Sequence, residues 1–87
     1  MSDAASVVPA SLDELRATVA GLVGASADEI ADEDDLVLDW ALDSVRAMAF
    51  VGRLREAGVE VDLMELSDVP TVTAWWALIE GRRPPVA

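Results

Sequence analysis

Apolar residues recur every three or four positions in three stretches of this chain, and each stretch predicts an α-helix. We expect the first helix over about residues 12–23, the second from Asp43 or Ser44 to about Ala57, and the third over about residues 72–80. Residues that favour helix ends flank these stretches: Ser11, Gly24, Gly58 and Thr71. The pattern predicts an all-α domain.

The second predicted helix is apolar on two neighbouring faces. One stripe consists of Ala47, Phe50, Val51 and Leu54, and the other of Val45, Met48, Ala49 and Gly52. A small core needs only one of these stripes. Either the helix is buried on both sides, or the second stripe is an exposed surface that docks partners.

The segments between the helices have different characters. Residues 25–43 are strongly acidic and predict a long loop, and we expect several of its apolar residues, which are Ile30, Leu36, Leu38, Trp40 and Leu42, to anchor it to the helices. Residues 59–63 alternate like a strand but have no partner strand, so they predict an extended connector. Leu63–Leu66 is expected to form one helical turn.

Composition narrows the possible functions. The 87 residues are enough for one domain, and they contain neither Cys nor His, which removes thiol nucleophiles, Ser-His pairs and the usual transition-metal ligands. The acidic loop lacks the EF-hand pattern, so we expect no metal site. A net charge of -11 disfavours nucleic acid and anionic lipid and favours basic protein partners. Without a signal-like start or a long apolar run, the chain is expected to be cytoplasmic and not to bind membranes.

Ser44 is the candidate for chemistry. A serine hydroxyl is a weak nucleophile, and this chain has no His or Lys to activate it, so only an external enzyme could modify it. A phosphodiester on Ser44 would lie at the start of a helix, where free backbone amides favour negative charge. The alternative is that Asp43-Ser44 is an ordinary helix cap.

The run Asp39-Trp40-Ala41-Leu42-Asp43-Ser44-Val45-Arg46, with Asp35-Leu36 before it, resembles the phosphopantetheine attachment region of acyl and peptidyl carrier proteins. The resemblance covers about residues 11–80. The run from Asp68 to Trp76, with the pair Trp75-Trp76 after Pro70-Thr71, is similar to the aryl carrier proteins of siderophore-type nonribosomal peptide synthesis.

This resemblance implies a four-helix carrier-protein bundle with a long first loop, a short third helix and no catalytic residues. It implies that Ser44 bears 4'-phosphopantetheine, which a phosphopantetheinyl transferase takes from coenzyme A. An aryl acid adenylating ligase would load salicylate or 2,3-dihydroxybenzoate as a thioester, and a condensation or cyclisation domain would receive it. The implied partner-binding residues surround Ser44 or follow it in the chain: Asp43, Val45, Arg46, Met48, Ala49, Leu63 and Ser67.

Two departures from the family pattern stand out. Ala41 occupies a position where carriers usually have glycine, which would stiffen the loop. Arg46, Arg53 and Arg55 lie on the second predicted helix, where fatty-acid carriers present acidic residues, and this argues against a fatty-acid synthase partner.

Several alternatives stay open from the sequence. The chain could be a peptidyl or polyketide carrier, or an acidic helical adaptor in which Ser44 only caps a helix. Of the two tryptophans, we expect one to fill the core and the other to lie at its edge, because adjacent helical residues point about 100° apart. We expect a monomer with a flexible N-terminus over residues 1–10, a carrier domain over residues 11–81 and a flexible tail over residues 82–87.

Overall fold

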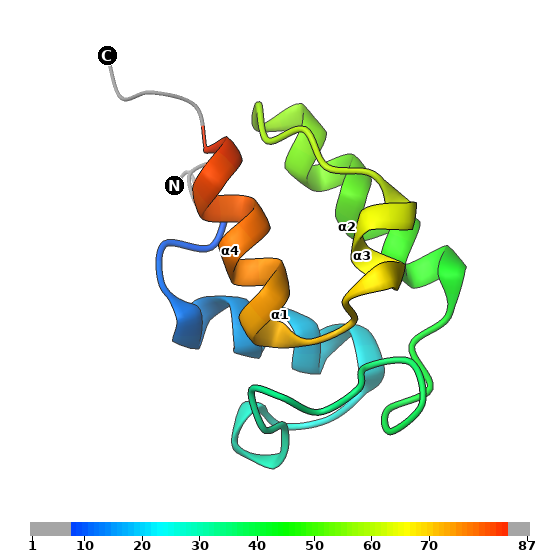
Figure 1. Cartoon of the computed structure of the whole chain (residues 1–87). Helices are drawn as coiled ribbons and strands as arrows, with labels where there is room; N and C mark the ends of the chain where they lie inside the picture. The colour runs from blue at the N-terminus through cyan, green and yellow to red at the C-terminus, as the bar shows by residue number, and fades with distance from the viewer. Residues whose placement is uncertain (1–7, 84–87) are drawn as a thin grey trace.

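The computed structural model describes residues 8–83 and contains four α-helices. They are α1 (Leu12–Val23), α2 (Ser44–Glu56), α3 (Leu63–Asp68) and α4 (Val72–Arg82), with a 3-10 turn, η2 (Ala27–Glu29), in the first loop. No strand occurs within the described residues. Figure 1 shows α2 beside α3 on one side of the bundle and α1 crossing α4 on the other. The predicted all-α, four-helix architecture is confirmed.

Side-chain caps fix the helix starts near their predicted positions. The Ser11 hydroxyl accepts a hydrogen bond from the backbone N–H of Glu14 at 3.1 Å, and the Thr71 hydroxyl accepts one from Ala74 at 3.1 Å. Gly24 ends α1 in the left-handed conformation, with a φ of 75°. Because that backbone conformation costs a glycine little, the position is a favourable helix stop.

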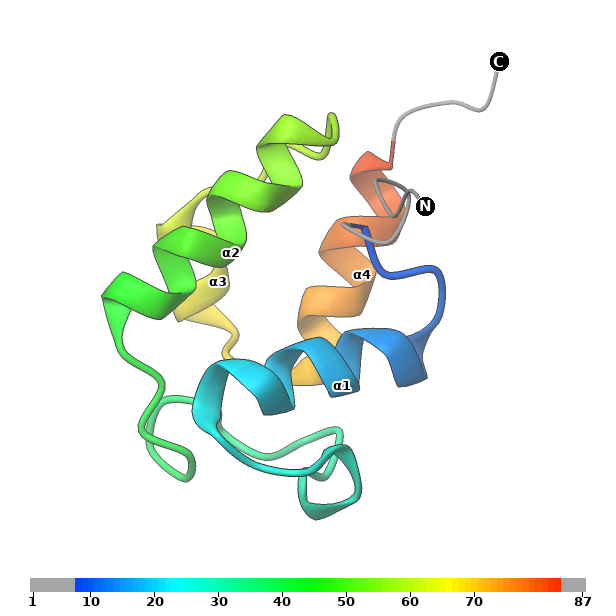
Figure 2. The same ribbon diagram turned by 180° about the vertical axis from the view of Figure 1, so that it is seen from behind.

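The core lies between the helices and is entirely apolar. Leu15 and Val19 enter it from α1, and Trp75 and Ile79 enter it from α4. The rings of Phe50, on α2, and Trp75 stack with centroids 5.7 Å apart and an interplanar angle of 20°. Figure 2 shows from behind the α1–α4 side and the α2–α3 side of the bundle, and residues of all four helices belong to the core. Stacking of large aromatics adds contact beyond simple burial.

The long loop is held against the helices rather than hanging free. Ile30, Leu36 and Leu42 are buried, and Trp40 packs partly buried against the core, as expected for several of its apolar residues. Leu38 is the exception, with 82% of its surface exposed. Leu36, Val37 and Leu38 are consecutive, and the side chains of three consecutive residues in one turn cannot all point into the core.

Two backbone contacts and one ion pair attach the loop to the helices. The N–H of Leu36 donates to the Pro70 carbonyl at 2.7 Å, and the N–H of Thr73 donates to the Asp32 carbonyl at 3.2 Å. Arg16, on α1, pairs with the Asp32 carboxylate. These contacts fix the middle of the loop against α1 and against the segment around the start of α4.

The observed boundaries differ from the predicted ones in small ways. α3 continues to Asp68 instead of stopping after one turn, and α4 continues to Arg82. Asp62 caps α3 and exchanges hydrogen bonds with Glu65, and this capping box supports the longer helix. Residues 59–62 connect the helices without regular secondary structure, with Val59 and Val61 buried, whereas Leu63, which was expected in the connector, is already the first residue of α3. Most of the expected flexible ends, residues 1–7 and 84–87, lie outside the described residues.

Candidate functional site

Asp43 and Ser44 take different roles at the start of α2. Asp43 is the N-cap, and its Oδ1 accepts a hydrogen bond from the backbone N–H of Arg46 at 2.8 Å. Ser44 is the first residue of the helix, and its side chain is exposed. Since Asp43 supplies the cap, the fold does not need the Ser44 hydroxyl for that purpose. The site therefore presents an exposed hydroxyl at a helix N-terminus.

Two features at the start of α2, the helix N-terminus and Arg46, favour an anion, whereas the neighbouring Asp43 carboxylate opposes one. The first backbone N–H groups of a helix lack intrahelical partners, and the helix dipole adds positive potential there. Arg46 contributes charge from the first turn, but its Nε lies 3.8 Å from Asp43 Oδ2 and its Nη1 donates to the Leu22 carbonyl at 3.0 Å. Arg46 therefore links α2 to the end of α1 while it remains next to Ser44.

The chain reverses direction just before Ser44. Ala41 has a φ of 55°, and among the described residues it is the one non-glycine residue with a positive φ. Its N–H donates to the Val37 carbonyl at 3.0 Å, and the N–H of Leu42 donates to the Leu36 carbonyl at 3.0 Å. The reversal buries the side chain of Leu42 and leaves Asp43 and Ser44 outside.

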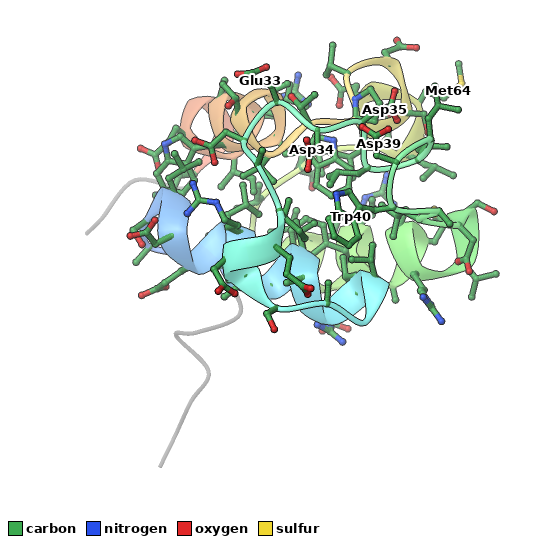
Figure 3. The ribbon with its side chains drawn as sticks, turned by 90° about the horizontal axis from the view of Figure 1, so that it is seen from below. Glu33, Asp34, Asp35, Asp39, Trp40 and Met64 are labelled. Atoms are coloured by element: carbon green, nitrogen blue, oxygen red, sulfur yellow. The ribbon has the colours of Figure 1, made fainter. Side chains whose placement is uncertain are left out.

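Carboxylates hold this turn together. Asp35 Oδ1 accepts hydrogen bonds from the backbone N–H groups of Val37 and Leu38 at 2.9 and 2.7 Å, and Asp39 Oδ2 accepts one from the N–H of Asp35 at 3.0 Å. Figure 3 shows Asp35 and Asp39 close together on this loop. These aspartates therefore supply acceptors for backbone amides of a turn that has little regular structure.

Asp34 makes a further contact in the same loop. Its Oδ2 accepts hydrogen bonds from Trp40 Nε1 and from the backbone N–H of Ala31, each at 3.0 Å. The bond from Trp40, followed by the bond from Ala31, holds the pKa of Asp34 below its ordinary value of 3.8, because both donors stabilise the ionised carboxylate.

An apolar pocket opens beside Ser44. Its volume is about 180 Å³, and its buried lining residues are Leu42, Ala47, Leu66 and Trp75. Trp75 is held there by a hydrogen bond from its Nε1 to the Leu66 carbonyl at 3.0 Å. The complete lining is Val37, Leu42, Asp43, Ser44, Ala47, Leu63, Leu66, Ser67 and Trp75.

The pocket brings together some of the residues named from the sequence. Asp43, Ser44, Leu63 and Ser67 all line it, although Leu63 and Ser67 are far from Ser44 in the chain. Val45, Met48 and Ala49 lie instead on the exposed face of α2, outside the pocket. The second apolar stripe of this helix is thus mostly exposed rather than buried.

Other exposed apolar side chains near the pocket were not identified from the sequence. Val37 lines the pocket and is 43% exposed, and Leu38 follows it in the chain. Met64 follows the lining residue Leu63 and is 72% exposed. The run Leu36-Val37-Leu38 was a usable signal, because a single turn cannot bury three consecutive apolar residues. Met64 gave no such signal, since α3 was expected to be only one turn.

The exposed Ser44 hydroxyl and the pocket beside it suit a narrow group that is attached to the serine through a negatively charged linkage. Ser44 offers an exposed oxygen beside free backbone amides, and the adjoining pocket offers an apolar surface with few charges. Within residues 8–83, no cluster of acidic side chains has the geometry of a metal site. None of the helices in this part of the chain combines the length and apolar character needed to cross a bilayer.

The chain is similar to known proteins over most of its length. The family model described as "Phosphopantetheine attachment site" matches residues 13–79. Enterobactin synthase component B of Escherichia coli K12 is 42% identical over 72 residues, which are 83% of this chain and 25% of that protein. Isochorismatase of Bacillus subtilis 168 is 39% identical over 70 residues, which are 80% of this chain and 22% of that protein.

A third relative shares an even smaller part of its length. Phenyloxazoline synthase MbtB of Mycolicibacterium paratuberculosis is 36% identical over 75 residues, which are 86% of this chain and 6% of that protein. The chain therefore spans at most about a quarter of these relatives. No solved structure matches it.

Proposed function

Because this chain belongs to the phosphopantetheine attachment-site family, whose members carry 4'-phosphopantetheine covalently, we propose that Ser44 is its attachment residue. The observation that carries the proposal is the division of roles at the start of α2. Asp43 caps the helix, and Ser44 remains exposed beside the pocket. When bound, the group supplies a terminal thiol that can hold an acyl unit as a thioester.

The attachment reaction requires an external enzyme. The Ser44 oxygen forms a bond to the β-phosphorus of coenzyme A, the bond from that phosphorus to the bridging oxygen breaks, and adenosine 3',5'-bisphosphate leaves. The hydroxyl proton must go to a base of the phosphopantetheinyl transferase, since this chain has no His or Lys. The N-terminal amides of α2 that Asp43 leaves free would favour the negative charge of the phosphodiester.

The cargo is proposed to be an aryl acid such as salicylate or 2,3-dihydroxybenzoate. The similarity to enterobactin synthase component B and to a phenyloxazoline synthase supports an aryl carrier in siderophore-type synthesis over a peptidyl or polyketide carrier. An aryl acid adenylating ligase would load the thiol, and a condensation or cyclisation domain of a nonribosomal peptide synthetase would accept the aryl group. We place this chemistry in the cytoplasm, where coenzyme A is available.

The exposed apolar side chains around Ser44 are the proposed docking surface for these partners. Val45 is 77% exposed and Met48 is 47% exposed, and both follow Ser44 on α2. Asp43, Arg46 and Ala49 complete the α2 part, and Leu63 and Ser67 contribute from α3. Exposed apolar residues gathered around one functional atom are typical of an interaction surface.

Intact mass spectrometry tests the attachment. After incubation with coenzyme A, magnesium and a broad-specificity phosphopantetheinyl transferase, the wild-type chain should gain one phosphopantetheine, and Ser44→Ala should gain none. Ser26→Ala, which removes another exposed serine, should be modified like the wild type. A wild-type chain that stays unmodified would contradict the proposal and favour the adaptor alternative.

The cargo is tested separately on the modified protein. Ligases for salicylate or 2,3-dihydroxybenzoate should load it faster than ligases for amino acids. Preferential loading with amino acids would contradict the aryl assignment while leaving Ser44 as the attachment residue.

A further inference from the structure

The hydrogen bond between Asp34 and Trp40 closes the part of the first loop that leads to Ser44. Asp34 Oδ2 accepts from Trp40 Nε1 at 3.0 Å, and the same oxygen accepts from the backbone N–H of Ala31 at 3.0 Å. Figure 3 shows the two side chains on the same loop. The indole is partly buried against the core, so its N–H group has to find a polar partner at the edge of the protein. Asp34 provides that partner.

Three residues, Ala41, Leu42 and Asp43, connect Trp40 to Ser44, so a movement of Trp40 affects the placement of Ser44. Trp40 directly precedes Ala41, whose left-handed backbone turns the chain, and Leu42 then enters the core. Asp43 follows and caps α2. A rotation of the indole out of its site would move the turn at Ala41, and the burial of Leu42 and the cap by Asp43 depend on that turn.

The other contacts of the loop do not replace this bond. Leu36 is fixed by its N–H bond to the Pro70 carbonyl, and Asp35 and Asp39 bind backbone amides within the turn. The contacts of Asp35 and Asp39, and the bonds from the N–H groups of Ala41 and Leu42 to the Val37 and Leu36 carbonyls, lie within the turn, so none of them ties residues 39–42 to the part of the loop before Asp35. Between Asp39 and Leu42, the indole is the one partly buried side chain, and its only hydrogen bond among the described residues goes to Asp34.

We propose that Asp34 and Trp40 are positioning residues for the modification of Ser44. Their bond holds the turn at Ala41 in the single conformation in which Asp43 caps α2 and the Ser44 hydroxyl faces outward. This inference rests on the proposed function, because it concerns the reaction of the phosphopantetheinyl transferase. Neither residue touches the reacting atoms. Their role is to limit the conformations that the transferase meets, so their loss should mainly raise the KM for this protein.

Three variants separate the hydrogen bond from other effects. Trp40→Phe keeps an aromatic ring in the core edge but removes the indole N–H donor. Asp34→Ala removes the acceptor, whereas Asp34→Asn keeps a carbonyl oxygen that can accept from Trp40 and should restore part of the function. Glu33→Ala is the matched control, because it removes the same charge from the neighbouring exposed position.

The rate of phosphopantetheine transfer to the full chain should be measured with coenzyme A and a broad-specificity transferase. We expect Trp40→Phe and Asp34→Ala to lower kcat/KM about tenfold, mostly through KM, while Glu33→Ala stays within about twofold of wild type. Asp34→Asn should lie between Asp34→Ala and wild type. In nuclear magnetic resonance spectra, the indole N–H signal of Trp40 should shift in Asp34→Ala and exchange faster with solvent.

A loss of stability alone must also be separated from positioning. Arg83→Ala removes an ion pair with Glu80 and a hydrogen bond to the Pro9 carbonyl, which lie in a different part of the fold. If it lowers the melting temperature as much as Asp34→Ala and slows the transfer equally, the positioning role is contradicted. If Trp40→Phe does not fold, Asp34→Ala and Asp34→Asn decide the question.

The outcomes distinguish this inference from the proposed function. A wild-type chain that is modified at Ser44, together with folded Trp40→Phe and Asp34→Ala proteins that react at the wild-type rate, overturns the positioning role alone. A wild-type chain that is never modified overturns both.

Discussion

At the scale of single residues, the turn before α2 depends on a residue that does not suit it. Ala41 adopts a φ of 55°, a conformation in which the Cβ atom crowds the following carbonyl oxygen. The hydrogen bonds that the carboxylates of Asp35, Asp39 and Asp34 accept hold the turn in spite of this cost. Relief of the strain should therefore stabilise the protein without changing its fold.

Ala41→Gly is expected to raise the free energy of unfolding by up to about 1 kcal/mol, because glycine tolerates the left-handed conformation and the gain exceeds its higher entropy when unfolded. The melting temperature should rise by a few degrees, as about 1 kcal/mol corresponds to roughly 4–8 °C in a domain of this size. Urea denaturation followed by circular dichroism measures the change. Ala49→Gly, in the exposed middle of α2, should instead lower stability by about 1 kcal/mol. A less stable Ala41→Gly would show that the turn at Ala41 is not strained.

At the scale of elements, α4 uses its two adjacent tryptophans in different ways, as the sequence predicted. Trp75 is 1% exposed, stacks on Phe50 and donates to the Leu66 carbonyl. Trp76 is partly buried, and the Arg83 guanidinium lies 5.7 Å from the centroid of its ring. Trp75 therefore packs in the core, whereas Trp76 contacts Arg83 just beyond the end of α4.

Replacing each tryptophan by leucine should show this difference. Trp75→Leu is expected to cost about 3 kcal/mol or more, because it leaves a cavity and removes the hydrogen bond to Leu66. Trp76→Leu should cost about 1 kcal/mol, since its ring is only partly removed from water. Urea denaturation measures both. Equal losses would contradict the assignment of Trp75 as the central core residue.

The sequence predicted the elements well where one periodic pattern decided the outcome. The apolar stripes of α1 and α2 and the stop at Gly24 follow from local residue types, and they appear in the structure as expected. The Asp62–Glu65 capping box at the start of α3 was not recognised from the sequence, and the helix continues two residues beyond the expected turn. The pocket could not be predicted, because it joins Val37, Ser44 and Leu63 from three separate segments. The sequence also left open whether Asp43 or Ser44 caps α2, since both residue types are suitable.

At the scale of the whole molecule, arginine–carboxylate pairs connect segments of a strongly acidic chain. Arg16 joins α1 to the loop through Asp32, and Arg82 joins the end of α4 to α3 through Glu65. Arg82 also donates to the Glu60 carbonyl at 3.1 Å. With a net charge of -11, the chain repels itself, so these few attractive contacts between distant segments help to fix its shape.

The pair between Glu65 and Arg82 should make part of the stability depend on pH. The hydrogen bond from Arg82, followed by the one from the backbone N–H of Asp62, holds the pKa of Glu65 below its ordinary value of 4.5. A carboxylate with a lowered folded-state pKa contributes stability above its unfolded pKa and loses it as the pH falls through the folded value. The stability difference between wild type and Glu65→Gln should therefore be constant near neutral pH and shrink below pH 4.5.

Urea denaturation of both proteins across this pH range measures the difference. Arg82→Gln should show the same pH dependence, and the double variant should lose little more than either single one. A difference that grows as the pH falls would contradict the proposed pairing.

The two ends of the described chain, at residues 8 and 83, lie on the same side of the bundle. Arg83 Nη2 donates to the Pro9 carbonyl at 2.7 Å and so ties the two described ends together, whereas the start of α2 lies on the opposite side of the molecule (Figures 1 and 2). A polypeptide fused to either end would therefore be joined to the domain on the side where Pro9 and Arg83 meet. The start of α2 would then lie on the side of the domain away from the fused polypeptide.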